Sequence, residues 1–160
     1  MTVRVGKFEK ISIAQAVNDG LSCNAYDNIK LPKRATKGSA GYDIVALQHI
    51  KLNPGESLKV ATGLKCKIDN GWFLGVFPKS GLGFKFHTTL ANTVGIVDED
   101  YFDNDTNEGH IWVKLCNEGD KVLEIDAGKA FCQGIFLPYG ITYDDTVNDI
   151  RKGGLGSTGK

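Results

Sequence analysis

The sequence lacks an excess of charge of one sign. Its 160 residues include 19 Lys and Arg and 19 Asp and Glu, so the formal net charge is zero. Without a bulk positive field, the chain is not expected to bind nucleic acid or an anionic membrane surface. Any phosphate group must therefore be bound locally, by a few cations and backbone amides.

Paired cysteines and long apolar runs are also missing. Cys23, Cys66, Cys116 and Cys132 form no Cys-x-x-Cys pair, which argues against a zinc knuckle, a redox motif or a disulfide scaffold. They are expected to be small buried side chains in a reducing compartment. No run approaches the ~18 apolar residues of a membrane span, and the first residues contain no signal-peptide core. We therefore expect one domain of a soluble, cytoplasmic protein.

Glycine is abundant, with 20 of 160 residues, well above the average of about 7%. The glycines separate short segments in which β-branched, aromatic and other apolar residues alternate with polar ones. Regularly spaced segments of this kind predict an all-β sandwich or barrel. The expected strands cover residues 58–60, 64–68, 72–77, 111–116, 121–125 and 130–137.

One helix is predicted near the start of the chain. Ser12 and Gln15 form a Ser-x-x-Gln capping box, and Gly20 supplies a stop signal. The helix is short and peripheral. At the other end, residues 151–160 contain four glycines, which predicts a flexible tail.

The acidic stretch Gly95–Gly109 has several interpretations. It contains six acidic residues, but starting the count at Asp98 or at Asp103 gives neither the glycine at position 6 nor the glutamate at position 12 of an EF-hand. A calcium loop is therefore not expected. Residues 103–108 favour a solvated hairpin turn. Asp98 follows the apolar Gly95-Ile-Val, where a charge is costly without a partner or a task.

Two other segments could bind an anion. Gly154–Lys160 matches G-x-x-x-x-G-K, but Tyr143–Ile150 before it is too acidic for the buried strand of a P-loop. Its amides and neighbouring cations could still wrap a polyphosphate, although composition alone favours a disordered terminus. Pro78–Gly83 contains a lysine and a serine, which could bind a phosphate group. Taken alone, the segment favours a Pro-Gly turn.

The sequence alone does not decide the roles of several isolated polar residues. Gln133 is expected to share a strand face with Phe131, Ile135 and Leu137, so it needs hydrogen-bond partners at an interface or has a functional role. The histidines show neither metal-ligand spacing nor a nucleophile partner, and are predicted to be structural or surface residues: His49, His87 and His110.

Taken in order, five segments resemble the five motifs of the trimeric dUTP pyrophosphatases (dUTPases). They are Ala40–Ile44, Pro78–Leu82, Gly95–Tyr101, Gly128–Gln133 and Gly153–Gly159. The resemblance covers residues 31–160, and five motifs in order are far more specific than any one of them. It divides the chain into an N-terminal extension (1–30), a dUTPase-like β domain (31–150) and a flexible, nucleotide-closing tail (151–160).

The resemblance implies a distorted jelly-roll-like barrel that assembles as a homotrimer, with each active site drawn from more than one subunit. It implies Mg²⁺-assisted hydrolysis of dUTP to dUMP and pyrophosphate, which limits uracil in DNA and supplies dUMP. Such a reaction needs positioning and charge neutralisation more than covalent chemistry. The absence of a Ser-His or Cys-His pair is then no obstacle.

By the same resemblance, Asp98 would orient the attacking water and Asp43 would hold waters of the triphosphate-bound Mg²⁺. Lys79, Ser80, the Gly81 amide and Gln133 would contact the phosphates. Uracil would be read by Asn92 and by the backbone of Ile96, Val97 and Asp98, and the deoxyribose would pack on Tyr101. The tail would contribute Arg151, Ser157 and Thr158 to the terminal phosphates, and Leu155 and Gly156 to the cover.

The sequence departs from the family pattern at several positions. Lys79 stands where arginine is usual, which keeps the charge but loses bidentate geometry. Leu155 replaces a phenylalanine that stacks on the base, so weaker closure is expected. The spacing from Arg151 to the following glycine pair is one residue short. About six residues are inserted after Tyr101, within residues 102–108.

Two other functions are alternatives to hydrolysis. A dUTPase-fold regulator could bind nucleotide or a protein partner through the inserted 102–108 loop, with weak catalysis. A dCTP deaminase on the same fold is disfavoured, because the five motifs resemble the hydrolase branch.

Overall fold

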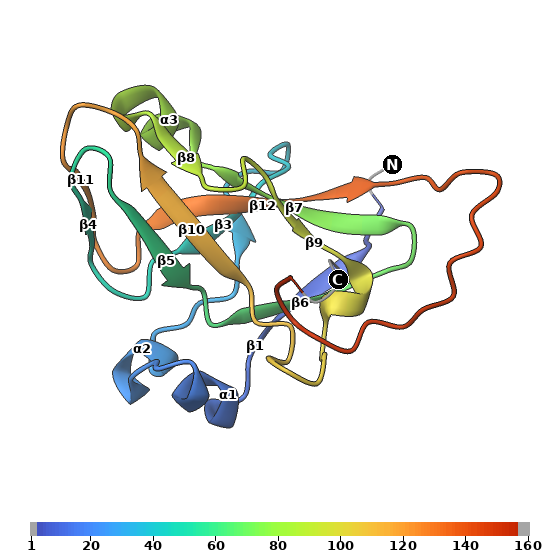
Figure 1. Cartoon of the computed structure of the whole chain (residues 1–160). Coiled ribbons are helices and arrows are strands. Elements are labelled where there is room, and N and C mark those ends of the chain that lie inside the picture. Colours follow the sequence, from blue (N-terminus) through green and yellow to red (C-terminus); the bar gives the residue numbers. More distant parts are fainter. Residues whose placement is uncertain (1–2, 157–160) are drawn as a thin grey trace.

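β-Strands form most of the secondary structure of the protein (Figure 1). The computed structural model describes residues 3–156. Its strands are β1 (Gly6–Lys10), β2 (Lys33–Arg34), β3 (Tyr42–Val45), β4 (Ile50–Leu52), β5 (Ser57–Ala61), β6 (Leu64–Ile68), β7 (Trp72–Pro78), β8 (Thr88–Leu90), β9 (Gly95–Val97), β10 (Trp112–Asn117), β11 (Leu123–Ile125) and β12 (Ala130–Pro138). The predicted all-β class is confirmed, as a distorted jelly-roll-like barrel.

The largest sheet positions most of the functional segments. Its order is β2-β3-β12-β7-β9, with antiparallel neighbours throughout. The β12–β7 pair runs from Cys132 opposite Pro78 to Pro138 opposite Trp72, and lies across the middle of the molecule in Figure 1. The smaller sheets are β5-β10-β8, β1-β6 and β4-β11.

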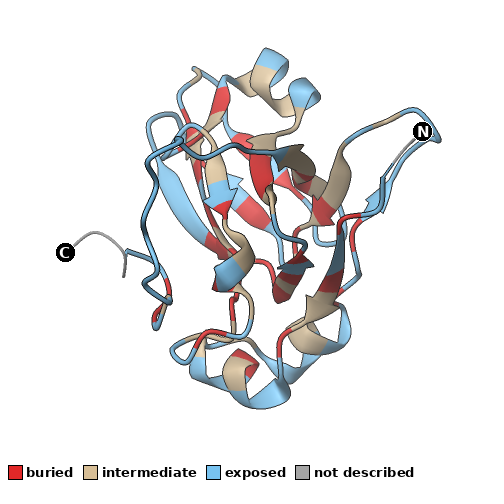
Figure 2. Ribbon diagram, turned by 90° about the vertical axis from the view of Figure 1, so that its right-hand side faces the viewer, coloured by how far each residue is buried: buried red, intermediate tan, exposed pale blue. Residues whose placement is uncertain are grey.

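The core lies between these sheets, as the burial pattern in Figure 2 shows. In β6, Leu64, Cys66 and Ile68 are buried and alternate with lysines, as their period of two predicts. In β12, by contrast, the neighbours Phe131 and Cys132 are both fully buried, and the register shifts between residues 130 and 132. This bulge interrupts the simple alternation that the sequence predicted around Gln133.

The cysteines differ in environment. Cys66 and Cys132 are buried, as predicted, and burial raises the pKa of the Cys66 thiol to about 12. The prediction was wrong for Cys23, which is exposed on a helix, and Cys116 is half-buried. All four are free thiols.

The helices are more numerous than the sequence predicted. Within the described residues they are α1 (Ile13–Asn18), α2 (Cys23–Asp27), α3 (Ser80–Phe86) and the 3-10 turn η1 (Glu99–Tyr101). The capping residue of α1 is confirmed, since the Ser12 hydroxyl accepts a hydrogen bond from the Gln15 amide at 3.0 Å. The turn interpretation of residues 78–83 was wrong, because α3 begins there. None of the helices described is long and apolar enough to cross a membrane.

The acidic 102–108 segment is also more structured than a solvated turn. Asn104 is 8% exposed, and its side chain donates to the Tyr101 carbonyl at 2.8 Å. Asp103 and Glu108 adopt positive φ angles of 54° and 55° where the chain reverses. The prediction of a solvated loop was therefore wrong for its inner side.

After β12, the chain leaves the barrel and returns. Residues 139–150 form an exposed arm without strands or helices, and Figure 1 shows the arm curving back so that the following tail lies near β9 and η1. Of the predicted closing tail, residues 151–156 are described. Ser157 and Thr158 lie outside the described residues.

Candidate active site

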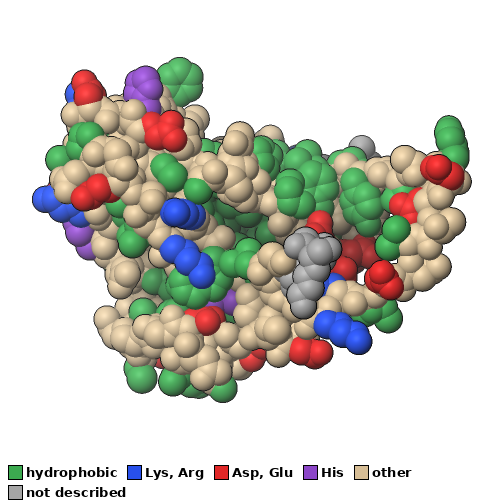
Figure 3. Space-filling model, viewed as in Figure 1, with side chains coloured by type: hydrophobic (Ala, Val, Ile, Leu, Met, Phe, Trp, Pro, Cys, Tyr) green, Lys and Arg blue, Asp and Glu red, His purple; other side chains and the backbone are tan. Residues whose placement is uncertain are grey.

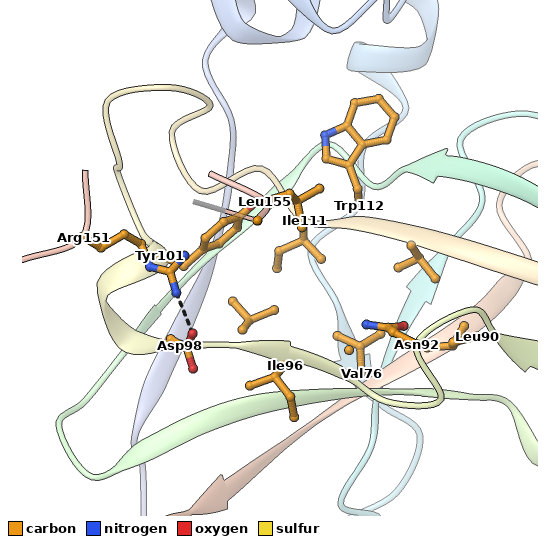
Figure 4. A pocket seen from close by; sticks show the side chains of 14 residues that line it. Val76, Leu90, Asn92, Ile96, Asp98, Tyr101, Ile111, Trp112, Arg151 and Leu155 are labelled. Carbon is orange, nitrogen blue, oxygen red and sulfur yellow. Dashed lines mark hydrogen bonds and ion pairs between the residues drawn. The ribbon is translucent and has the colours of Figure 1, made fainter. Parts of the chain in front are cut away.

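A pocket lies between β9, η1, the start of β10 and the tail (Figure 4). Eight of the predicted site residues line it: Asn92, Ile96, Val97, Asp98, Tyr101, Arg151, Leu155 and Gly156. Apolar side chains that sequence reasoning did not select complete the wall: Val76, Leu90, Ile111, Trp112 and Val113. All of them except Ile111, which directly precedes β10, belong to strands, so their apolar character indicated a core. On the face shown in Figure 3, hydrophobic side chains gather across the middle, and acidic ones gather toward the arm at the right.

Asp98 stands at the polar end of this pocket. It follows β9 and precedes η1, and its side chain is 50% exposed. Arg151 binds it through Nη2 at 2.7 Å, and binds Asp100 through Nε at 2.8 Å. The planar guanidinium suits two carboxylates at once. Because both carboxylates are about half exposed, solvent screens the two ion pairs, and they stabilise the tail only weakly, by about 0.2–1 kcal/mol.

Arg151 is also the residue that the sequence predicts to contact the terminal phosphates. In this structure its side chain is 9% exposed and its guanidinium lies 5.6 Å from the centroid of the Tyr101 ring. Asp100, the second carboxylate, was not among the predicted site residues. Its place two residues after Asp98 is the signal that could have identified it.

Tyr101 forms a rigid wall of the pocket. It is 6% exposed, its hydroxyl donates to the His110 carbonyl at 3.0 Å, and it accepts from Asn107 Nδ2 at 2.9 Å. Burial raises the pKa of the phenol, so the ring is neutral at physiological pH. A buried ring held at both sides cannot easily move away from a ligand.

Asn92 stands at the opposite end of the pocket from Asp98 in Figure 4. It belongs to a tight turn in which Thr93 has a φ of 65° and the Val94 amide donates to the Asn92 carbonyl at 2.6 Å. An exposed amide side chain and the backbone of β9 therefore face the pocket from one side. Groups of this kind can donate to and accept from the edge of a planar ring.

A second group of predicted residues lies elsewhere on the chain. Lys79 Nζ pairs with Asp43 Oδ1 at 2.5 Å, and the two side chains are 29% and 30% exposed. Gln133 Nε2 donates to the Pro78 carbonyl at 3.1 Å. Ser80 and Gly81 begin α3 directly after Lys79 and are exposed. The ion pair joins the residues predicted to act on the metal and on the phosphates.

Gly41 supports this second group in a way that sequence reasoning missed. A Cβ atom at this position would lie 2.2 Å from Gln133 Oε1 and 3.0 Å from Gln133 Cδ. Only glycine leaves room for the glutamine side chain in its observed place. The close approach can be recognised only once β3 and β12 are known to pair.

The two groups are separated along and across the large sheet. Val97, before Asp98, is level with Leu74 on β7, whereas Gln133 is level with Phe77 and with Asp43. Four residues along a strand span ~13 Å, and the three strand spacings from β9 to β3 span ~14 Å. The carboxylates of Asp98 and Asp43 thus lie on the order of 20 Å apart. One chain does not bring them to the same phosphate.

The histidines are structural or exposed, as predicted. His49 and His87 lie at the surface, whereas His110 is fully buried behind Tyr101. His110 Nε2 accepts from the Gly63 amide at 2.9 Å, so Nδ1 carries the proton and faces Asp19 Oδ2 at 2.5 Å. Burial, the larger influence, lowers the pKa of His110 despite Asp19.

Comparison with known proteins identifies relatives of this arrangement. The sequence model of the dUTPase family matches residues 27–159. A deoxyuridine 5'-triphosphate nucleotidohydrolase of Lactococcus lactis is 38% identical over 133 residues, which cover 82% of this chain and 89% of that protein. One of Mannheimia succiniciproducens is 36% identical over 138 residues, which cover 81% and 87%.

Solved structures share the fold. The dUTPase of Streptococcus mutans superimposes with a TM-score of 0.68 at 33% identity, and the match covers 84% of this chain and 97% of that one. A dUTPase from phage phi11 of S. aureus, whose species-specific insert has been visualised, matches with a TM-score of 0.66 at 18% identity, covering 92% and 98%.

Proposed function

Because the chain belongs to the dUTPase family, it is a hydrolase that converts dUTP to dUMP and pyrophosphate, and we propose that Asp98 orients the attacking water. The observation that carries this assignment is the pocket itself, where Asp98 is the carboxylate at one end of a cleft in which most of the lining side chains are apolar. A positioned carboxylate can accept the proton of a water that attacks the α-phosphorus. By this reaction the protein limits uracil in DNA and supplies dUMP.

The remaining pocket residues fit the two halves of the nucleoside. Asn92 and the backbone of Ile96, Val97 and Asp98 can hydrogen-bond uracil. The buried Tyr101 ring supports the deoxyribose and leaves no space for a 2′-hydroxyl, because its hydroxyl is tied on both sides. Leu155 and Gly156 cover the site from the tail. Leucine excludes water but cannot stack on the base.

Arg151 has two roles in this proposal. In the free protein it pairs with both Asp98 and Asp100. A triphosphate brings several negative charges to the same place and competes for the guanidinium. Since the pairs with exposed carboxylates are weak, substrate can take the arginine and leave the Asp98 carboxylate free for water.

The phosphate chain is assigned to the second group of residues. Lys79, Ser80, the Gly81 amide and Gln133 would contact the phosphates, and Asp43 would hold waters of Mg²⁺. Within residues 3–156, no three His, Cys, Asp or Glu side chains gather as a metal site. Mg²⁺ usually keeps several waters and takes one or two carboxylates plus phosphate oxygens, which fits Asp43 acting through water. The ion would neutralise charge on the triphosphate.

The distance between the two groups supports an active site shared by copies of the chain in a homotrimer. The Asp98 pocket of one copy would face Asp43, Lys79 and Gln133 of another. The arm supports the same assembly, because Ile141, Tyr143 and Ile150 are exposed in the single chain. Apolar side chains in an arm without internal packing are suited to bury against another subunit. We also propose a cytoplasmic location, as expected from the sequence.

Mixing two inactive variants tests the shared site. Asp98→Asn and Asp43→Asn subunits, unfolded together and refolded as mixed trimers, should regain about one quarter of wild-type activity if each site combines two copies at random. The same variants refolded separately should be inactive. A mixture that remains as inactive as its components would contradict a site built from different copies.

A substrate panel tests the specificity of the pocket. Pyrophosphate release is expected from dUTP, with little or none from dTTP or UTP, whose 5-methyl and 2′-hydroxyl groups meet the β9 backbone and Tyr101. Ammonia release from dCTP would instead assign the chain to deaminases.

A second proposal is a binding partner at the 102–108 loop, although the structure favours it less, because that loop contacts its own chain. Deletion of the loop that left activity and every interaction with other proteins unchanged would eliminate this role.

A further inference from the structure

The 102–108 loop is a fixed element of the fold. The Asp103 amide donates to the Glu108 carbonyl, and the Glu108 amide donates to the Asn104 carbonyl, each at 3.1 Å. At the centre, Asn104 Oδ1 accepts from the amides of Thr106 and Asn107 at 3.1 and 3.2 Å. A nearly buried asparagine that accepts and donates within the loop holds it in one conformation.

The outer side of this loop is attached to the N-terminal segment and to β6. Glu108 accepts from the Ser12 amide at 2.9 Å and from the Ser12 hydroxyl at 2.5 Å. Asp103 pairs with Lys65 of β6, and the Lys65 ammonium lies 5.0 Å from the centroid of the Phe102 ring. The residue that caps α1 therefore also anchors the loop.

The inner side of the loop meets the tail. Gly154 is buried, and a Cβ atom at this position would lie 2.9 Å from Thr106 Oγ1 and 3.0 Å from Asn107 Nδ2. Asn107 Nδ2 also donates to the Tyr101 hydroxyl at 2.9 Å. The tail backbone thus lies so close to the loop, next to the wall of the pocket, that a larger residue at position 154 would have to displace the side chains of Thr106 and Asn107.

From these contacts we propose that the 102–108 loop is a docking platform that holds residues 151–156 over the Asp98 pocket, with Asn107 as a positioning residue for both the tail and Tyr101. Its effect on catalysis rests on the proposed function, because the docked tail carries Arg151 and Leu155 to the site. Leu155 is 65% exposed and does not fix the tail by its own packing. The 102–108 loop holds the tail in place instead.

The docking predicts a pattern of kinetic effects. A tail that is held less often over the pocket weakens binding of substrate and transition state alike, which raises KM more than it lowers kcat. A direct effect on the water or on Asp98 would instead lower kcat. The split between the two constants therefore distinguishes docking of the tail from chemistry.

Limited proteolysis of the full-length protein without nucleotide tests the platform directly. Trypsin can cleave after Arg151 or Lys152, and mass spectrometry measures the loss of the C-terminal residues. In Gly154→Ala, the added methyl group collides with the loop, and cleavage is expected to be roughly tenfold faster than in wild type. Gly140→Ala is the matched control, because Gly140 lies in the arm that precedes the tail and nothing lies within 4 Å of its Cβ position.

A double variant tests whether contact with the 102–108 loop is what protects the tail from cleavage. In Asn107→Ala the docked tail has already lost its support, so adding Gly154→Ala should increase cleavage little, and the two effects should be non-additive. Equal cleavage of Gly154→Ala, Gly140→Ala and wild type would overturn the proposal, as would simple additivity with Asn107→Ala.

Proteolysis and activity report on separate claims. Faster cleavage of Gly154→Ala in a protein that leaves dUTP intact would refute the proposed function and support the platform. Unchanged cleavage in a protein that hydrolyses dUTP would do the reverse.

Discussion

Loss of the buried contact between His110 and Asp19 is expected to lower the stability of the fold. In Asp19→Ala, the Nδ1 proton of His110 loses its acceptor, while Nε2 remains occupied by the Gly63 amide. His110 is 0% exposed, so water does not readily replace the carboxylate. A buried donor left without a partner costs about 1–3 kcal/mol. A domain of this size loses about 2–4 °C of melting temperature per kcal/mol, so a loss of about 4–8 °C is expected for ~2 kcal/mol.

The pH dependence of this effect has a definite sign. The pKa of folded His110 lies below its ordinary value, chiefly because burial disfavours the charged form. The unfolded chain therefore binds a proton that the folded chain does not, and stability falls as the pH falls below about 6.5. Asp19 partly offsets the lowering. Removal of Asp19 lowers the pKa of His110 further. The difference in stability between wild type and Asp19→Ala should therefore be larger at about pH 5.5 than at about pH 7.5.

Thermal unfolding at equal protein concentration measures both effects, since assembly into the proposed homotrimer would make the melting temperature depend on concentration. Asp27→Ala is the control, because Asp27 is exposed at the end of α2. It should change the free energy of unfolding by less than about 0.5 kcal/mol. If Asp19→Ala melts within the error of Asp27→Ala at both pH values, the reasoning about the buried pair is refuted.

Two further predictions concern the site and the platform. Gly41→Ala should displace Gln133 and reduce kcat for dUTP by about tenfold or more while the melting temperature changes little, because a flexible side chain can move out of the way. Wild-type kcat in this variant would contradict a role for Gln133 in its observed position. Glu108→Gln should speed tryptic cleavage of the tail by a few fold, since the carboxylate that accepts twice from Ser12 becomes neutral. Cleavage unchanged from wild type would show that Ser12 does not brace the loop.

Local patterns predicted six of the strands in the described residues, β5, β6, β7, β10, β11 and β12, for physical reasons. In β6 each apolar side chain faces the core and each lysine faces away, so burial itself produces the alternation. The same reasoning failed at α3, where Pro78, Gly81 and Gly83 resemble a turn. The helix forms there because the Gly83 amide reaches the Lys79 carbonyl at 3.0 Å, and it ends at His87 with a φ of 50°.

The site was predictable in part. Asp98 and Tyr101 could be selected from the order of the motifs, and the structure brings them to one pocket with Asn92 and Leu155. The partner of Asp98 could not be read from any local pattern, because Arg151 lies 53 residues away in the sequence. The contact of His110 with Asp19 spans 91 residues. Such contacts depend on how the whole chain packs.

The inserted loop illustrates the same limit. Its acidic and amide residues are typical of a solvated turn, and composition alone supports no other interpretation. Asn104 and Asn107 acquire their roles only because Tyr101 and Gly154 approach the loop from outside it. Sequence reasoning predicted an insertion at residues 102–108 but could not tell which side of the loop faces the protein.

The most direct test of the central claim is pyrophosphate release from dUTP by wild type, Asp98→Asn and Asp100→Asn, with dUTP binding measured by calorimetry on the same preparations. Asp98→Asn should bind dUTP and lose about 10²–10⁴-fold in kcat, as expected when a water-orienting carboxylate is removed. Asp100→Asn removes the other carboxylate of Arg151 and should retain most of its turnover. Near-wild-type turnover of Asp98→Asn would contradict the assignment of this pocket as the place where dUTP is hydrolysed.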